Sequence, residues 1–373
     1  MSAKKLVAGL SAAVLCCLTA GVAAASPAPR ASVTVSTVVT GLDNPRDLAF
    51  GRNGKLYVAE AGHGGTHCLS GGPNGMTCYG FTSGISRINI SHHHARRIVS
   101  GLVSTAAQDG TFATGVDGIS RRHHNIFGII TGAPDAVPAG SFGAPFRSRI
   151  KAELGRLIRV SSDGTWRRIA SVGHRDYIWS GNHTSLVPGQ FPDANPYGVL
   201  AQRHAQWVVD AASNTLDRVG RHGRVHVLQF IPNPPSSDSV PTCVVRGPDG
   251  ALYIGELTGG GNAPGASSVW RYSRRTGNLT LWATGLTAVT GCGFHRDHFY
   301  ATEFSTNGLD NAAPGTGAVV RVPANSSSPV TVVSGLNFPG GFAARQHSLF
   351  VSNWSVRPTS QGGGEVTRIL LGS

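Results

Sequence analysis

The sequence has little charge and no long hydrophobic segment beyond its first 25 residues. Charged residues make up 14% of the 373 residues, too few for a solvated disordered chain, whereas hydrophobic residues make up 40%, enough for a core. The 50 glycines and 21 prolines exclude long helices as the main architecture. The chain also lacks a Gly-x-Ser-x-Gly elbow, a phosphate-binding loop and a His-Glu-x-x-His helix, so no motif indicates a catalytic chemistry. The composition predicts an all-β, turn-rich protein.

The first 25 residues contain the three parts of a secretory signal peptide. Lys4 and Lys5 give a positive start, an apolar run begins at Leu6, and Ala23–Ala25 offers small residues for cleavage. The apolar run is too short for a stable membrane span. We therefore expect a secreted, extracellular protein whose mature chain, residues 26–373, forms one domain.

Acidic residues are scarce, and so is lysine. The formal charge is +13, and only Lys4, Lys5, Lys55 and Lys151 are lysines among the 32 basic residues. A secreted protein of this charge can meet anionic wall polymers or acidic polysaccharides, but the simpler interpretation, which we favour, is a solvated basic surface. Nucleic acid is not expected as a partner, because the arginines are spread along the chain and no recognition module occurs.

A six-fold repeat is the strongest signal in the sequence. Its copies are Leu56–Glu60, Ile126–Ile130, Gln206–Asp210, Leu252–Glu256, Phe299–Glu303 and Leu349–Asn353. The second residue of every copy is aromatic, and the fifth is acidic or an amide in five of them. Turn signals such as Asp249-Gly250 precede the copies, and further β-branched segments follow them. These segments are too short for helices, so each repeat is expected to contain four strands.

Six units of four strands predict a six-bladed β-propeller. Wider gaps between the first three repeats place insertions at 62–80, 132–151 and 173–196. The last unit has three strands, at 342–345, 348–353 and 365–370. Its missing fourth strand is expected to come from residues 33–42, which end in Thr-Gly-Leu as other fourth strands end in Ser-Gly-Leu or Thr-Gly-Leu. Such closure hides the edges that an open array would expose.

Four cysteines remain in the mature chain, at Cys68, Cys78, Cys243 and Cys292, and their even number indicates two disulfides. Cys68 and Cys78 lie in one insertion and are expected to pair. Zinc is the alternative there, because two histidines lie nearby, but an oxidising compartment favours the disulfide. Cys243 and Cys292 open the innermost strands of two consecutive blades at equivalent positions of the repeat, so we expect them to join those blades.

Several segments resemble one family. They are Val39–Leu42 followed by Pro45-Arg46, Gly54–Glu60, Asn195–Gly198, Val209–Asn214 and Gly247–Gly259. In these segments the chain is similar to the ScyD/ScyE-type secreted β-propellers, relatives of NHL-repeat and lactonase-like propellers. The resemblance covers essentially the whole mature chain and implies the propeller fold, but it brings no catalytic residues with it. Arg221-His222-Gly223 stands where an Asp-rich turn is usual.

Polar residues are expected to gather at the channel mouth, the face where the connections between blades enter. They close the second strands or lie in those connections, and the candidate ligand-binding residues are Asn44, Arg46, Glu60, Asn195, Tyr197, Asp210, Glu256, Glu303 and Asn337. The carboxylates of Glu60, Asp210, Glu256 and Glu303 are oxygen donors of the kind that Ca²⁺ prefers. The alternative is that each side chain only caps its own turn.

Two functions therefore remain open. The first is a secreted binding or scaffold protein, a monomer that recognises an extracellular small molecule, glycan or protein at the channel mouth. The second is a lactonase-like hydrolase in which the same carboxylates hold Ca²⁺. The blade-by-blade repetition of these carboxylates favours the first function, in which no cofactor is required.

Overall fold

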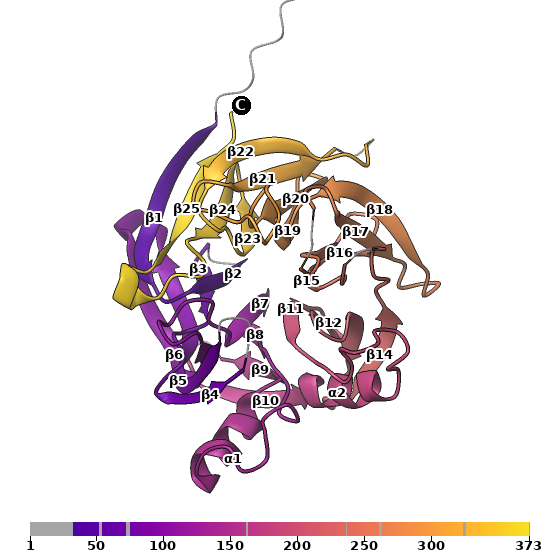
Figure 1. Ribbon diagram of the computed structural model, residues 1–373. Coiled ribbons are helices and arrows are strands. Elements are labelled where there is room, and N and C mark those ends of the chain that lie inside the picture. The colour runs from indigo at the N-terminus through magenta and orange to yellow at the C-terminus, as the bar shows by residue number, and fades with distance from the viewer. Residues whose placement is uncertain are drawn as a thin grey trace, which may run out of the picture.

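The computed structural model describes residues 33–372 apart from 52–53, 72–74, 162, 236, 261–262 and 324–325. Six antiparallel sheets surround a central axis, as the view along that axis shows (Figure 1). The predicted six-bladed β-propeller is confirmed. The predicted signal peptide, residues 1–25, lies outside the described residues. Among the residues described, no helix is both long and apolar enough to cross a membrane.

The first three blades contain all the large insertions. Blade 1 consists of β2 (Pro45–Phe50), β3 (Leu56–Glu60), β5 (Met76–Asn89) and β6 (His94–Ala106), with β4 (His67–Ser70) added beside β5. Blade 2 consists of β7 (Val116–Arg122), β8 (Asn125–Ile130), β9 (Arg156–Val160) and β10 (Trp166–Ser171). Blade 3 consists of β11 (Pro196–Ala201), β12 (Gln206–Asp210), β13 (Thr215–Val219) and β14 (Val225–Phe230). The insertions carry β4, α1 (Ala144–Glu153) and α2 (Val172–Gly181).

The last three blades are more regular. Blade 4 consists of β15 (Pro241–Arg246), β16 (Leu252–Glu256), β17 (Ser267–Tyr272) and β18 (Leu279–Leu286). Blade 5 consists of β19 (Val289–His295), β20 (His298–Glu303), β21 (Gly317–Val322) and β22 (Val330–Leu336). Blade 6 consists of β23 (Phe342–Arg345), β24 (Ser348–Asn353), β25 (Gly364–Leu370) and β1 (Thr34–Leu42).

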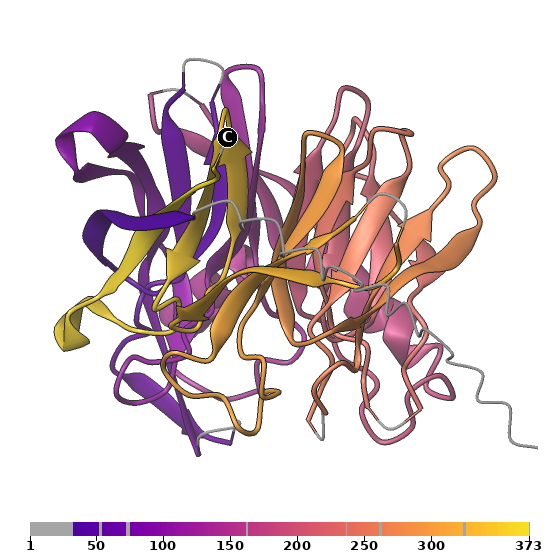
Figure 2. The ribbon, with the colours of Figure 1, turned by 90° about the horizontal axis from the view of Figure 1, so that it is seen from above.

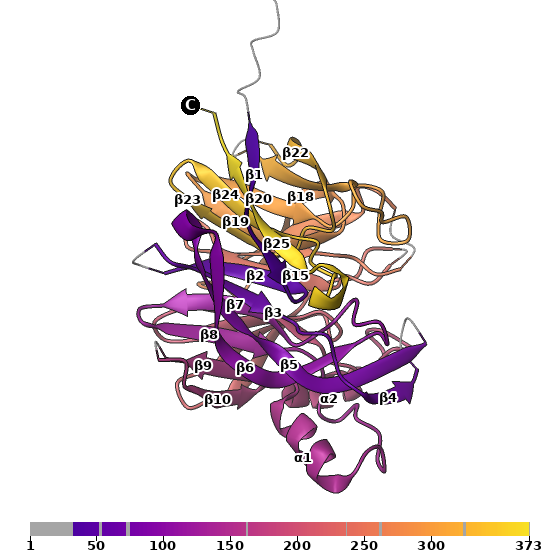
Figure 3. The same cartoon turned by 90° about the vertical axis from the view of Figure 1, so that its left-hand side faces the viewer.

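The ring closes in blade 6, where the two ends of the chain pair. β1 runs antiparallel to β25, with Thr34 opposite Leu370 and Leu42 opposite Gly364. Figure 3 shows the two strands side by side. Val38 and Leu42 of β1 are buried in one cluster with residues of blade 1. The predicted closure is confirmed.

Aromatic side chains of the second strands fill the boundaries between blades. The Tyr253 ring of blade 4 lies 4.9 Å from the Phe294 ring of blade 5. The Phe350 ring of blade 6 lies 5.1 Å from the Phe50 ring of blade 1. Because side chains alternate along a strand, one aromatic residue per repeat is enough to cover the same side of every blade.

The propeller has two different faces, which Figure 2 shows with the ring edge-on. Short turns join the first strand to the second and the third to the fourth, and they lie on one side, here called the hairpin face. The loops from second to third strands and the connections between blades lie on the other side, the channel mouth.

Both expected disulfides form, Cys68–Cys78 and Cys243–Cys292. The expected equivalence of Cys243 and Cys292 within the repeat is wrong by one residue. Cys243 is the second residue after Pro241, whereas Cys292 is the third after Val289, and these two starting residues face Glu256 and Glu303. Equivalent side chains of two blades point the same way around the ring and cannot meet. A shift of one residue reverses the direction and lets the sulfurs approach.

Candidate functional site

A β-bulge begins the innermost strand of five blades. The pairing register shifts between Val116 and Gly118, Pro196 and Gly198, Pro241 and Cys243, Val289 and Gly291, and over a wider interval between Pro45 and Leu48. A bulge leaves its extra residue unpaired and re-aims its side chain. The skipped residues are Arg46, Asp47, Asp117, Tyr197, Thr242 and Thr290, here called the axial ring because they line the central space.

The innermost strands of neighbouring blades approach each other closely because small residues follow the bulges. A Cβ atom at Gly118 would overlap the carbonyl oxygen of Tyr197 in the next blade. A Cβ atom at Gly341, which directly precedes β23 of blade 6, would overlap the backbone of Asp47. Glycine is therefore required where one blade approaches the backbone of its neighbour.

Charged groups of the axial ring lie on blades 1 and 2, with Tyr197 of blade 3 beside them. The Arg46 Nε atom lies 3.6 Å from the Asp117 Oδ1 atom, and Arg46 also donates a hydrogen bond to the Ala113 carbonyl oxygen. Burial raises the pKa of Asp117 to about 6, although Arg46 opposes the rise. Burial likewise raises the pKa of Tyr197 to about 12.

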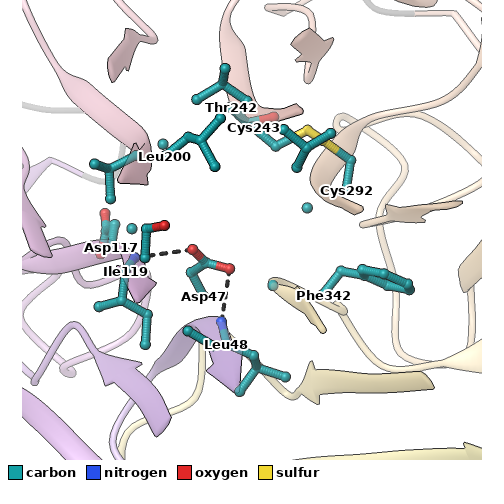
Figure 4. Close-up of a pocket in the computed structure, with 18 of the residues that line it drawn as sticks. Asp47, Leu48, Asp117, Ile119, Leu200, Thr242, Cys243, Cys292 and Phe342 are labelled. Atoms are coloured by element: carbon teal, nitrogen blue, oxygen red, sulfur yellow. Dashed lines mark hydrogen bonds between the residues drawn. A yellow bond between two sulfur atoms is a disulfide. The ribbon is translucent and has the colours of Figure 1, made fainter. Parts of the chain in front are cut away.

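Asp47 is the second carboxyl group on the axis, and its side chain is half-buried. It accepts hydrogen bonds from the backbone N–H groups of Ile119, at 3.0 Å, and Leu48, at 2.8 Å (Figure 4). Burial raises its pKa to about 7, and the two hydrogen bonds only partly oppose this. The net charge of Arg46, Asp47 and Asp117 therefore changes from positive to negative between about pH 5 and pH 8.

Above the axial ring, the channel mouth opens into a cavity of about 680 Å³. Its floor includes Arg46, Tyr197, Thr242 and Thr290, and its apolar walls come from loops of several blades. The wall residues include Phe112, Val240, Leu257, Phe304, Leu309, Phe338 and Val356. Phe112 is 53% exposed at the edge of the cavity. A smaller space of about 250 Å³, lined by Asp47 and Asp117, continues along the axis (Figure 4).

The structure brings together three of the nine candidate residues. Arg46, Asn195 and Tyr197 line the cavity at the channel mouth. The others do not line it: Asn44, Glu60, Asp210, Glu256, Glu303 and Asn337. Asn44, for example, donates to the carbonyl oxygens of Gly62 and Gly110 and so fixes the loops around it.

The polar residues that end the second strands accept hydrogen bonds from the backbone of the segment that enters their own blade. Glu60 accepts from the Asp43 N–H group at 2.8 Å, Asp210 from Asn195 at 2.8 Å, and Glu303 from Thr287 at 2.8 Å. In blade 6 the Asn353 oxygen accepts from the Asn337 N–H group in the same way. Glu256 instead accepts from the Ser239 hydroxyl at 2.9 Å and from the Trp270 indole.

A single calcium ion does not fit these carboxylates. Glu60, Asp210, Glu256 and Glu303 belong to four blades, and each is engaged by donors of its own blade. Within the described part of the chain, no three His, Cys, Asp or Glu side chains are grouped so that they could hold a metal ion. Burial raises the pKa of both Glu256 and Glu303 to about 7, which also weakens them as ligands at neutral pH.

Blade 3 contains a cluster of three fully buried carboxyl groups, Asp176 of α2, Asp210 of β12 and Asp217 of β13. Both oxygens of Asp176 and one oxygen each of Asp210 and Asp217 accept no hydrogen bond. Burial, and then repulsion from the neighbouring carboxylates, raises the pKa of Asp176 well above its ordinary range. Burial raises the pKa of Asp217 in the same way. This cluster therefore holds protons to higher pH than ordinary carboxyl groups do.

The raised pKa values of the buried carboxyl groups predict that the protein loses stability as the pH rises. A carboxyl group whose pKa is raised by folding stabilises the native state below its unfolded pKa of about 4, and this stabilisation is lost as the pH passes its folded pKa. We expect the free energy of unfolding, measured with urea, to fall between pH 5 and pH 8, because burial raises the pKa of Asp117 to about 6 and that of Glu256 and Glu303 to about 7. Asp117→Asn should reduce this fall, because the amide carries no charge at this fully buried position.

Asp163→Asn is the matched control. Asp163 lies in an exposed turn, where its own hydrogen bonds with Thr165 lower its pKa. The Asp163→Asn substitution should leave the pH dependence of the free energy of unfolding unchanged between pH 5 and pH 8. An Asp117→Asn protein that loses as much stability over this range as the unmodified protein would contradict the assignment.

Sequence reasoning did not select Asp47, Asp117, Thr242, Thr290 or the apolar walls. The bulge residues do carry a signal, since Asp117, Tyr197 and Thr290 each precede a glycine at the start of an innermost strand. The walls come from loops whose spacing differs between blades, and no repeat marks them.

Comparisons with known proteins support the fold. No protein-family profile and no curated protein sequence matches the chain. A solved gluconolactonase from Xanthomonas campestris is similar, with a TM-score of 0.53 and 10% identity over 92% of this chain and 91% of that one. A putative oxidoreductase (glucose dehydrogenase) from Thermus thermophilus has a TM-score of 0.52 and 14% identity over 91% of this chain and 100% of its own. These likenesses show the β-propeller fold of the chain.

Proposed function

We propose that this protein is a secreted binding protein that holds a small organic molecule at the channel mouth. The observation that carries the proposal is a cavity of about 680 Å³ with apolar walls and a polar floor. Sites for small molecules commonly measure roughly 300–1,000 Å³ and combine apolar walls with a few polar groups that orient the ligand. Membership of the ScyD/ScyE-type family, with its extracellular location, forms part of the same proposal.

The proposed ligand has an apolar body and a polar head. The body would pack against the wall residues, among them Phe304 and Phe338, whose rings lie 5.1 Å apart. The head would reach Arg46 and Tyr197 on the floor. A calcium-dependent hydrolase has less support, because the carboxylates that it needs are separated and engaged in their own blades.

The fluorescent anion 1-anilinonaphthalene-8-sulfonate has this shape and tests the proposal. At pH 5 Asp47 and Asp117 are mainly protonated, so the Arg46 charge favours the sulfonate; at pH 8 both are mainly ionised and repel it. We expect the dissociation constant of the probe to increase about tenfold from pH 5 to pH 8, the effect of reversing one charge near a partly buried anion. Asp117→Asn should reduce this increase.

Two double variants show whether the probe occupies the cavity. Phe112→Ala/Leu309→Ala removes apolar wall at the channel mouth and should weaken binding. Leu281→Ala/Val330→Ala removes two exposed apolar residues of β18 and β22 that do not line this cavity, and should not weaken binding. Equal affinity of the two double variants would count against the cavity as the binding site.

A further inference from the structure

Each of the six blades places a cation at its first hairpin. The six residues are Lys55, Arg122, Arg203, Arg246, Arg296 and Arg345, here called the cation ring. The first hairpin joins the innermost strand to the next one, so these side chains surround the axis on the hairpin face. Five of them are exposed, and Arg122 is half-buried. The arginines that are spread along the sequence are therefore brought together by the fold.

Acidic residues are almost excluded from this face. Among the described turns of the hairpin face, only Asp163, Asp249 and Asp297 are acidic. Asp249 is paired with Arg271, at 2.6 Å. The second strands run away from this face, so their terminal carboxylates lie at the channel mouth instead. The positive charge of the protein is thus concentrated on one side, where it attracts anions.

Three consecutive boundaries between blades are hollowed and lined by cations. The boundary of blades 4 and 5 has a hollow of about 400 Å³ lined by Arg246 and Arg296, and Asp297 is its one acidic lining residue. The boundary of blades 5 and 6 has a groove of about 450 Å³ with Arg296, Arg321, His295 and His298. The boundary of blades 6 and 1 has a groove of about 600 Å³ that contains Lys55. Together they follow an arc around the hairpin face.

We propose that the hairpin face binds an acidic polysaccharide along this arc. A linear polymer with an anionic group on successive sugars can place those groups in consecutive hollows. The last groove also offers Ser36, Thr37, Asn89 and Ser91, whose side chains can form hydrogen bonds with sugar hydroxyls. The proposal is independent of the ligand at the channel mouth, because it concerns the opposite face.

Single-stranded nucleic acid is less well suited to this face. Its binding usually combines cations with exposed aromatic side chains on which bases stack. Among the exposed large hydrophobic residues of the described chain, Phe112 alone is aromatic, and it lies at the channel mouth.

Binding of three polymers to the mature protein tests the proposal, with single-stranded DNA measured beside them as a competing polyanion. The polymers are polygalacturonate, which carries carboxylates, dextran sulfate, which carries sulfates, and uncharged dextran. We expect the two anionic polymers to bind, more weakly in 0.3 M than in 0.05 M NaCl because salt screens exposed charges, and uncharged dextran not to bind. The ratio of the two affinities identifies which anionic group the face prefers.

Two variants with the same change in net charge locate the binding face. Arg246→Glu/Arg296→Glu reverses two charges of the cation ring, whereas Arg147→Glu/Lys151→Glu reverses two on α1. We expect the first variant to bind both anionic polymers at least about tenfold more weakly in low salt, where charge pairs are least screened, and the second to change binding less than about twofold. Melting curves confirm that both remain folded.

Three results would overturn the proposal. They are equal losses in the two variants, no binding of either anionic polysaccharide, and tighter binding of single-stranded DNA than of both polysaccharides. Equal losses would mean that net charge alone attracts the polymer, and tighter DNA binding would assign the face to nucleic acid.

Discussion

A protein that lacks residues 26–42 is expected to show no cooperative unfolding transition at 25 °C. The deletion removes β1, and with it the partner of β25 and the outer strand of blade 6. Val38, Val39 and Leu42 are buried, and burial of each such side chain contributes about 1.5–3 kcal/mol. Their combined loss is about 5–9 kcal/mol, which is similar to the whole stability of many proteins, about 5–15 kcal/mol.

Point variants in β1 separate the loss of packing from the loss of the strand. Val38 is 3% exposed and packs with residues of blades 1 and 6, whereas Val35 on the same strand is 45% exposed. Val38→Asp should lower the melting temperature strongly, and Val35→Asp should change it little. A deletion variant with an unchanged melting temperature in circular dichroism would show that the ring does not depend on this closure.

Removal of the Cys243–Cys292 disulfide should have the second largest effect on stability. The bond closes a loop of 49 residues and joins blades 4 and 5. In the chain-entropy model a loop of this length stabilises the native state by about 4 kcal/mol, because it restricts the unfolded chain. Cys243→Ala/Cys292→Ala should lower the free energy of unfolding by this amount in urea titrations.

The Cys68–Cys78 disulfide provides the internal comparison. It closes a loop of 10 residues within the β4–β5 hairpin of blade 1. The same relation gives a smaller contribution, about 3 kcal/mol, and this hairpin lies at the edge of the ring. Cys68→Ala/Cys78→Ala should therefore be less destabilising. The reverse order of the two losses would contradict the assignment of Cys243–Cys292 as the main covalent brace of the ring.

The fold could be predicted because its determinants are local and recur. Every repeat has an aromatic residue in its second strand, and five of the six end that strand with an acidic residue or an amide, as Tyr253 and Glu256 do after the turn at Asp249-Gly250. Six copies make such a pattern reliable even where single copies are weak, as at Ile126–Ile130. Closure could be predicted for the same reason, since the ending of β1 matches that of other fourth strands.

The candidate site could be predicted only in part, because it depends on one-residue details. The repeat places Glu60 and Asp210 at the channel mouth but does not say that their carboxylates turn back to backbone N–H groups. A bulge decides that Asp117 and Thr290 face the axis, and a bulge becomes visible only when the strand register is known. A shift of one residue also explains why Cys243 and Cys292 do not occupy the equivalent positions of the repeat that the sequence had led us to expect.

The pairing of β1 with β25 also has a consequence for the order of folding. β1 is the first strand of the propeller to be synthesised, and its partner is the last, since Thr34 faces Leu370. Contacts between residues so distant in sequence form slowly, because the intervening chain must first be ordered. Blades 1 to 5 can each form from a continuous stretch of chain as it is made. Blade 6 can form only after β25 has been made, and until then the apolar side chains of β1 lack their partner strand.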